Sequence, residues 1–86
     1  MLTPPSLSGK ALILASGPSK PNADEILRAG LSEYRHEELE MQRIDLGGRT
    51  ILALLIALDP AHFDYIEKEL IDSCSKQDLD VAMELL

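Results

Sequence analysis

The chain has 86 residues, the length of one small domain. Its formal net charge is −7, with fifteen Asp and Glu against eight Lys and Arg, and no cluster of cations is available for a phosphate backbone. Binding to nucleic acid or to an anionic membrane surface is therefore not expected. The single cysteine excludes an internal disulfide and a zinc site built on cysteines. No apolar stretch approaches the roughly 20 residues of a membrane helix, and no signal peptide is present, so a cytoplasmic protein is expected.

The N-terminal third of the chain predicts a leader, a strand, a loop and a helix. Residues 1–10 contain prolines, serines and a glycine and are expected to form a flexible leader, which leaves residues 11–86 as the folded domain. Residues 11–15 are a short apolar run typical of a buried strand, and residues 17–21 form a loop with two prolines and a glycine. Asn22 and Glu25 have the spacing of a capping box, so a helix is expected to begin there. The apolar stripe of this helix contains Ala23, Ile26, Leu27, Gly30, Leu31 and Tyr34.

The middle of the chain predicts a β-hairpin. Residues 39–46 alternate between polar and apolar, as a half-exposed strand does, but the apolar phase shifts between Met41 and Ile44. Such a shift predicts a bulge or a bend within the strand. The glycines at 47–48 fit a two-residue hairpin turn, and the nearly continuous apolar run at 50–58 predicts a central strand after it.

The C-terminal part predicts a second helix and a last strand. Asp59 is a suitable cap and Pro60 suits the first helical position, because its missing N–H has no partner there. The apolar residues that follow have helical spacing: Phe63, Ile66, Leu70, Ile71 and Cys74. Residues with strand spacing end the chain: Leu79, Val81, Met83 and Leu85.

The resulting order of strand, helix, strand, strand, helix, strand determines the fold class. It predicts an α+β ferredoxin-like βαββαβ sandwich, with a four-stranded antiparallel sheet and two helices on one face. Because the middle strands are apolar on both sides, the other face of the sheet should also need cover. A second copy of the chain or another domain is the expected partner.

No catalytic or metal site can be assembled from the sequence. Asp78 and Asp80 form an Asp-x-Asp pattern, but a helix precedes it and too little chain follows to supply the rest of an aspartyl-phosphate enzyme. They are interpreted as a turn residue and a solvent-facing strand residue. His36 and His62 have no third ligand at a metal spacing, and Cys74 lies on an apolar helix face without a base. No catalytic residue, metal or cofactor is expected.

The loop after the first strand is the one candidate binding site. It ends at a helix N-terminus, where free N–H groups and the helix dipole attract a carboxylate or phosphate. The alternative is a simple connection that its prolines stiffen. The candidate ligand-binding residues are Gly17, Ser19, Lys20, Asn22 and Ala23.

At residues 16–27, 40–49, 50–58 and 79–84 the chain resembles the ACT domain, and most closely the N-terminal ACT domain of bacterial phosphoserine phosphatases. In such domains the first loop reads like G-x-D-x-P-G, and its last glycine approaches a bound amino acid. Gly17 and Pro21 match this pattern, while Ser19 replaces the aspartate and Asn22 replaces the last glycine. Asn tolerates the left-handed conformation, so the loop shape is expected to be kept. The resemblance implies dimerisation through side-by-side sheets or facing helices and control of an attached catalytic domain.

The resulting hypothesis is a non-catalytic regulatory and dimerisation domain of a phosphoserine phosphatase in L-serine biosynthesis, which binds a small amino acid such as serine. The chain would then be part of a larger hydrolase. The alternative is a freestanding ferredoxin-like interaction or adaptor protein without a ligand. A small acylphosphatase-like hydrolase ranks last, because the loop lacks the arginine that this chemistry uses.

Overall fold

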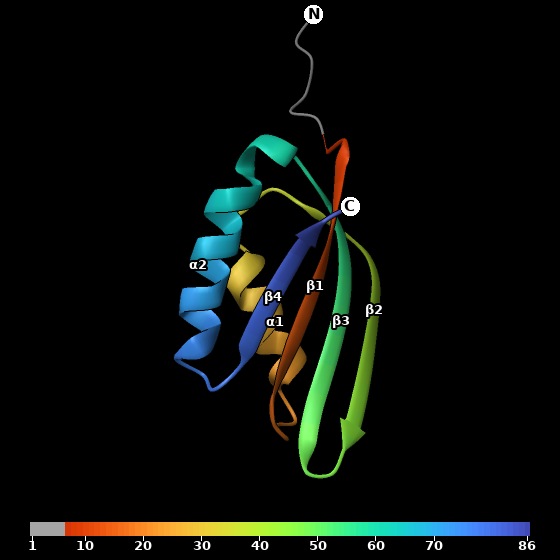
Figure 1. The fold of residues 1–86 in the computed structure, drawn as a ribbon, viewed down its shortest axis with the longest axis vertical. Coiled ribbons are helices and arrows are strands. Elements are labelled where there is room, and N and C mark those ends of the chain that lie inside the picture. Colours follow the sequence, from red (N-terminus) through yellow and green to blue (C-terminus); the bar gives the residue numbers. More distant parts are fainter. Residues whose placement is uncertain (1–6) are drawn as a thin grey trace, which may run out of the picture.

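A four-stranded antiparallel sheet with two helices against one of its faces makes up the fold, as Figure 1 shows. The computed structural model describes residues 7–86. The elements in chain order are β1 (Gly9–Pro18), α1 (Ala23–Leu31), β2 (Glu37–Leu46), β3 (Arg49–Leu58), the 3-10 turn η1 (Pro60–His62), α2 (Phe63–Ser75) and β4 (Asp80–Leu85). The expected βαββαβ order and ferredoxin-like architecture are confirmed. No helix within the described part of the chain combines the length and the apolar character needed to cross a bilayer.

Strand β1 lies in the middle of the sheet, whose order is β2-β3-β1-β4. It pairs with β3 from Gly9↔Leu58 to Pro18↔Arg49, and with β4 on its other side from Ala11 to Ser16. Gly9 and Lys10, which were expected in the leader, therefore belong to β1. Residues 1–6 of the expected leader lie outside the described residues.

The hairpin between β2 and β3 turns at Gly47 and Gly48, whose φ angles are +60° and +77°. Positive φ at both central residues is the requirement of a type I′ turn, so the predicted hairpin is confirmed. The bulge in β2 lies between Glu38 and Glu40, earlier than the expected shift between Met41 and Ile44. That shift has a different cause: Met41 packs against the core, whereas Ile44 is 52% exposed on the opposite face. The strand thus supplies apolar side chains to both faces.

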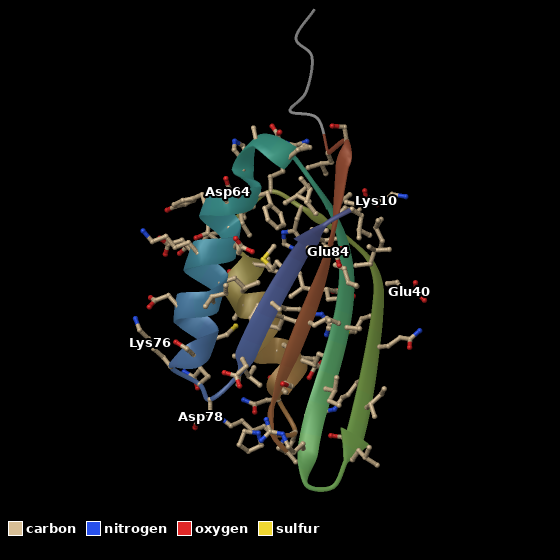
Figure 2. The ribbon with its side chains drawn as sticks, in the orientation of Figure 1. Lys10, Glu40, Asp64, Lys76, Asp78 and Glu84 are labelled. Carbon is tan, nitrogen blue, oxygen red and sulfur yellow. The ribbon has the colours of Figure 1, made fainter. Side chains whose placement is uncertain are left out.

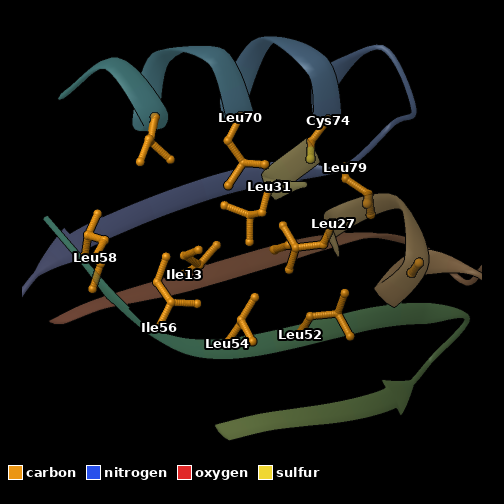
Figure 3. Packing of buried hydrophobic residues seen from close by; sticks show 14 residues of the cluster. Ile13, Leu27, Leu31, Leu52, Leu54, Ile56, Leu58, Leu70, Cys74 and Leu79 are labelled. Carbon is orange, nitrogen blue, oxygen red and sulfur yellow. The ribbon is translucent and has the colours of Figure 1, made fainter. Parts of the chain in front are cut away.

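The hydrophobic core fills the space between the sheet and the helices, as Figure 3 shows. It is almost entirely aliphatic, and alternate residues of the two central strands point into it. Its largest fully buried side chains include Ile13, Leu27, Leu31, Leu52, Leu54, Ile56, Leu58, Ile66 and Leu70. Cys74 is also buried in this core.

The helix starts differ in how they are capped. Asp59 accepts a hydrogen bond from the N–H of Ala61 over 2.9 Å, so its predicted role as a cap is confirmed. Asn22 stands at the cap position of α1, but its side chain makes no capping hydrogen bond, and the predicted capping box is wrong. Only the backbone carbonyl of Asn22 takes part, accepting from the N–H of Ile26 over 3.0 Å. The Asn22 amide is therefore not used by the helix.

Candidate ligand-binding site

The loop between β1 and α1, residues 19–22, is tied to the end of the sheet where the β2–β3 hairpin turns. The N–H of Ser19 donates to the carbonyl oxygen of Gly48 over 2.9 Å. The N–H of Ala23 donates to the carbonyl oxygen of Lys20 over 3.3 Å, which closes a turn just before α1. The loop is thus fixed by backbone bonds at both ends.

Arg43 of β2 fixes the middle of the same loop. Its guanidinium donates to the carbonyl oxygens of Lys20, at 2.7 Å, and of Pro21, at 3.1 Å. It also donates to the Asp45 carboxylate over 3.0 Å, and Asp45 accepts from the buried hydroxyl of Thr50 over 2.7 Å. These hydrogen bonds from Arg43 and Thr50 lower the pKa of Asp45. The charged network makes the loop a rigid part of the sheet end rather than a free connection.

Lys20 connects the loop to the turn between α2 and β4. Its ammonium donates to the carbonyl oxygen of Gln77 and lies 3.9 Å from the Asp78 carboxylate. Gly17 allows this close approach, because a Cβ at that position would collide with the carbonyl oxygen of Asp78. Figure 2 shows Asp78 at this end of the molecule. The Lys20 ammonium is therefore already paired with protein groups.

An open groove of about 450 Å³ lies between α1 and α2. Helix α1 contributes Ile26, Ala29 and Gly30, and a Cβ on Gly30 would lie 2.7 Å from the Leu70 side chain of α2. Gly30 thus permits the close approach of the two helices. The polar groups that line the groove are the amides of Asn22 and Gln77 and the hydroxyl of Ser73. The groove therefore has uncharged polar groups at one end and an apolar floor.

The structure separates the five residues that the sequence suggested for ligand binding. Gly17 and Ala23 are buried, where they serve packing, and Lys20 is paired as described. Ser19 and Asn22 are exposed, and of the five only Asn22 lines the groove.

Sequence reasoning missed Ser73, Gln77 and Arg43. The first two come from the far end of the chain, and no local pattern marks them. Arg43 did leave a signal: it shares the alternation of Met41, and so points to the helix side of β2, where a charge needs partners.

The residues considered for metal binding or catalysis do not form a site. Within residues 7–86 no three His, Cys, Asp or Glu side chains are grouped so that they could hold a metal ion. Asp78 lies in a turn with a φ of +62°, and Asp80 is the exposed first residue of β4. The Asp-x-Asp pattern thus has the two placements that the sequence suggested.

The family model described as ACT domain matches residues 10–84. The chain belongs to the ACT domain family. Domains of this family are regulatory, commonly dimerise and bind small amino acids. The expected resemblance to the ACT domain is confirmed, whereas the closer likeness to the phosphoserine phosphatase domain stays a prediction. No curated protein matches the chain.

Several solved structures share the ACT fold of this chain. An ACT domain protein from Streptococcus pneumoniae superposes with a TM-score of 0.80 at 14% identity, covering 90% of this chain and 89% of that one. A putative glycine cleavage system transcriptional repressor gives a TM-score of 0.82 at 20% identity, covering 94% of this chain and 47% of that one. A formyltetrahydrofolate deformylase from Pseudomonas putida KT2440 gives 0.71 at 20% identity, covering 90% of this chain and 28% of that one. The ACT chain therefore spans about half of the repressor and less than a third of the deformylase, and at these identities the likeness is one of fold.

Proposed function

We propose that this ACT domain is a regulatory module that binds a small amino acid in the groove between α1 and α2. The observation that carries the proposal is the position of the groove, which opens beside the rigid loop and includes the unused amide of Asn22. Its volume of about 450 Å³ falls in the range of roughly 300 to 1,000 Å³ that small-ligand pockets occupy.

The groups around the groove suit the two charged ends of an amino acid. The amides of Asn22 and Gln77 can each donate and accept hydrogen bonds. The positive end of the α1 dipole, next to Asn22, favours the carboxylate. The side-chain amide oxygens of Asn22 and Gln77, which line the groove, can accept from the ammonium. Ala29 and Ile26 leave an apolar floor on which a small side chain fits.

The rigid loop adds to this binding, because a site that is already ordered loses less conformational entropy when a ligand arrives. Arg43 supplies that order through its bonds to the carbonyls of Lys20 and Pro21. Arg43 is therefore a positioning residue in this proposal, and it does not touch the ligand.

Titration calorimetry with L-serine, glycine and L-alanine tests the proposal. We expect binding heat with at least one of them, and an affinity about tenfold lower in Asn22→Ala, because a hydrogen bond to a charged group is lost. Ser73→Ala should also weaken binding. The matched control is Ser75→Ala, which removes an exposed hydroxyl from the same helix outside the groove. Absence of heat with every amino acid at millimolar concentration would refute the proposal.

The proposal extends to the enzyme that this domain regulates. The resemblance to the phosphoserine phosphatase domain favours L-serine as ligand and that hydrolase as the attached enzyme. The structures reported above carry the names of other proteins, and the full reading frame is the direct test. A frame without a phosphatase domain would exclude this assignment and leave ligand binding to be judged by calorimetry.

A second candidate function is association without a ligand, as in an adaptor protein. The specific observation that favours it is the uncovered apolar face of the sheet, on which Leu14 is 46% exposed and Ile51 is 40% exposed. Calorimetry separates the two candidates, because an adaptor of this kind gives no heat with amino acids.

A further inference from the structure

The sheet has an apolar face that no element among residues 7–86 covers. We call it the open face; it consists of the strand residues that point away from α1 and α2. Leu12, Leu14 and Ser16 of β1 lie on it, because the alternate residues of that strand are in the core. Figure 2 shows Lys10 and Glu40 projecting on the side of the sheet opposite to α2. An exposed apolar surface with a polar border is typical of an association site.

The strand register arranges the open face in rows across the sheet. Leu12 stands between Leu55 of β3 and Glu84 of β4, and Leu14 stands between Ala53 and Ala82. Large side chains are therefore followed by small ones along β3 and β4.

A hollow of about 360 Å³ lies beside the first of these rows. The residues that line it are Leu12, Glu40, Gln42, Ala53, Leu55 and Leu86. Leu14 is 46% exposed and pairs with Ala53 of this hollow; with Ile51 and Ala82 it also lines a second hollow of about 360 Å³. The face thus carries both a protruding apolar side chain and a space that fits one.

We propose that a second copy of this chain packs on the open face. The two copies are related by a two-fold axis that lies in the interface and crosses β1 at a right angle, between Leu12 and Leu14. The two β1 strands then run antiparallel across the interface. Leu14 lies opposite the partner's Leu12 and reaches the partner's hollow. Lys10 lies opposite the partner's Ser16, which is paired with Asp80 in the next strand.

The charges of the border favour this position of the axis. Lys10 and Asp80 take part in no ion pair within the described residues, and the axis brings Lys10 next to the partner's Asp80 twice, once on each side. An axis through Leu12 would place Glu84 opposite its own copy, and an axis through Leu14 would place it opposite the partner's Asp80. The intermediate axis places Glu84 opposite the partner's Ala82. It is thus the arrangement that avoids facing acids.

The size of the overlap predicts a reversible dimer. Four strands about 4.8 Å apart give a face about 19 Å wide, and the overlap from Lys10 to Ser16 is about 23 Å long. Each copy would bury about 440 Å², or roughly 900 Å² in total, which is the lower end for specific interfaces. The dimer should therefore form and dissociate with protein concentration. It leaves the groove and the edges of β2 and β4 free, so it differs from side-by-side sheets or facing helices.

Sedimentation equilibrium over a wide range of concentration tests the proposal. The wild-type chain should show a monomer–dimer equilibrium, and Leu14→Glu should be monomeric throughout. The matched control is Ile71→Glu, which places the same charge on an exposed apolar residue of α2 and should leave the equilibrium unchanged. Circular dichroism confirms that each variant is folded. A wild-type chain that stays monomeric, or a dimer that Ile71→Glu dissociates and Leu14→Glu does not, would overturn the proposal.

A charge exchange tests the axis itself. Lys10→Glu and Asp80→Lys should each weaken the dimer about fivefold or more, because each reverses both symmetric contacts. The double variant should dissociate no more than about twofold more easily than wild type, since the pairs are restored in reverse. Failure of the double variant to recover would refute this axis. Ligand heat at the groove is measured separately, so failure of the dimer and failure of amino-acid binding are distinguishable.

Discussion

Replacing Gly17 by alanine tests the close contact between β1 and the α2–β4 turn. A Cβ at this position would overlap the carbonyl oxygen of Asp78 and would lie 3.0 Å from the Leu79 side chain. The obstacle is backbone, and β1 is held in place by its pairing with β3 at Gly17 and with β4 as far as Ser16. Overpacking of a tight core costs about 1 to 3 kcal/mol, and we expect Gly17→Ala to cost about 3 kcal/mol.

Urea unfolding measures this loss. A chain of this size has an unfolding free energy of roughly 4 to 13 kcal/mol, so the variant should remain folded in water unless the wild type is at the low end. With a slope of about 1 to 1.5 kcal/mol per M, the midpoint should fall by about 2 to 3 M. Gly30→Ala is the contrasting variant: its Cβ meets the end of a Leu70 side chain, and alanine regains about 1 kcal/mol of helix propensity. An unchanged midpoint in Gly17→Ala would show that the turn moves freely and that the contact is not tight.

Two further predictions concern the charged network. Arg43→Met should leave the fold intact but accelerate amide hydrogen exchange in the β1–α1 loop, because two loop carbonyls lose their hydrogen-bond donor. Arg49→Met is the control. Equal exchange rates in the two variants would contradict the role of Arg43. Hydrogen bonds from Arg28 and Arg43 lower the pKa values of Glu38 and Asp45 respectively. The two ionised carboxylates contribute their full stability at a pH above their pKa values in the unfolded chain, which are about 4. This contribution is lost as the pH falls through their lower pKa values in the folded protein. The urea midpoint should therefore decline between about pH 5 and about pH 3, and a decline of the same size in Asp45→Asn would contradict the contribution of Asp45.

The fold could be predicted because each element carries its own local signal. The alternation at 79–85 and the helical spacing from Phe63 to Cys74 depend only on which side of an element is buried. The error in β2 arose where this premise failed. Ile44 is apolar but lies on the uncovered face, so its phase relative to Met41 says nothing about a bulge.

The candidate site could be predicted only in its local part. The loop was found from its prolines and glycine, and Asn22 was found from its distance to Glu25. The groove needs Gln77 and Ser73, which the packing of α2 on α1 brings near, and a local pattern contains no information on that packing. The pairing of Lys20 with Asp78 was missed for the same reason, since it joins residues from opposite ends of the domain.

The central place of β1 in the sheet also affects how the chain folds during its synthesis. The first strand to be synthesised needs the last one, because Ala11 pairs with Leu85. This pairing closes a loop that contains nearly the whole domain, and closing the loop costs conformational entropy. Folding should therefore be slow for so short a chain. Until the six residues of β4 have emerged from the ribosome, one edge of the apolar strand β1 stays without its partner. Nascent chains of this domain should therefore be prone to aggregate until the last strand has emerged.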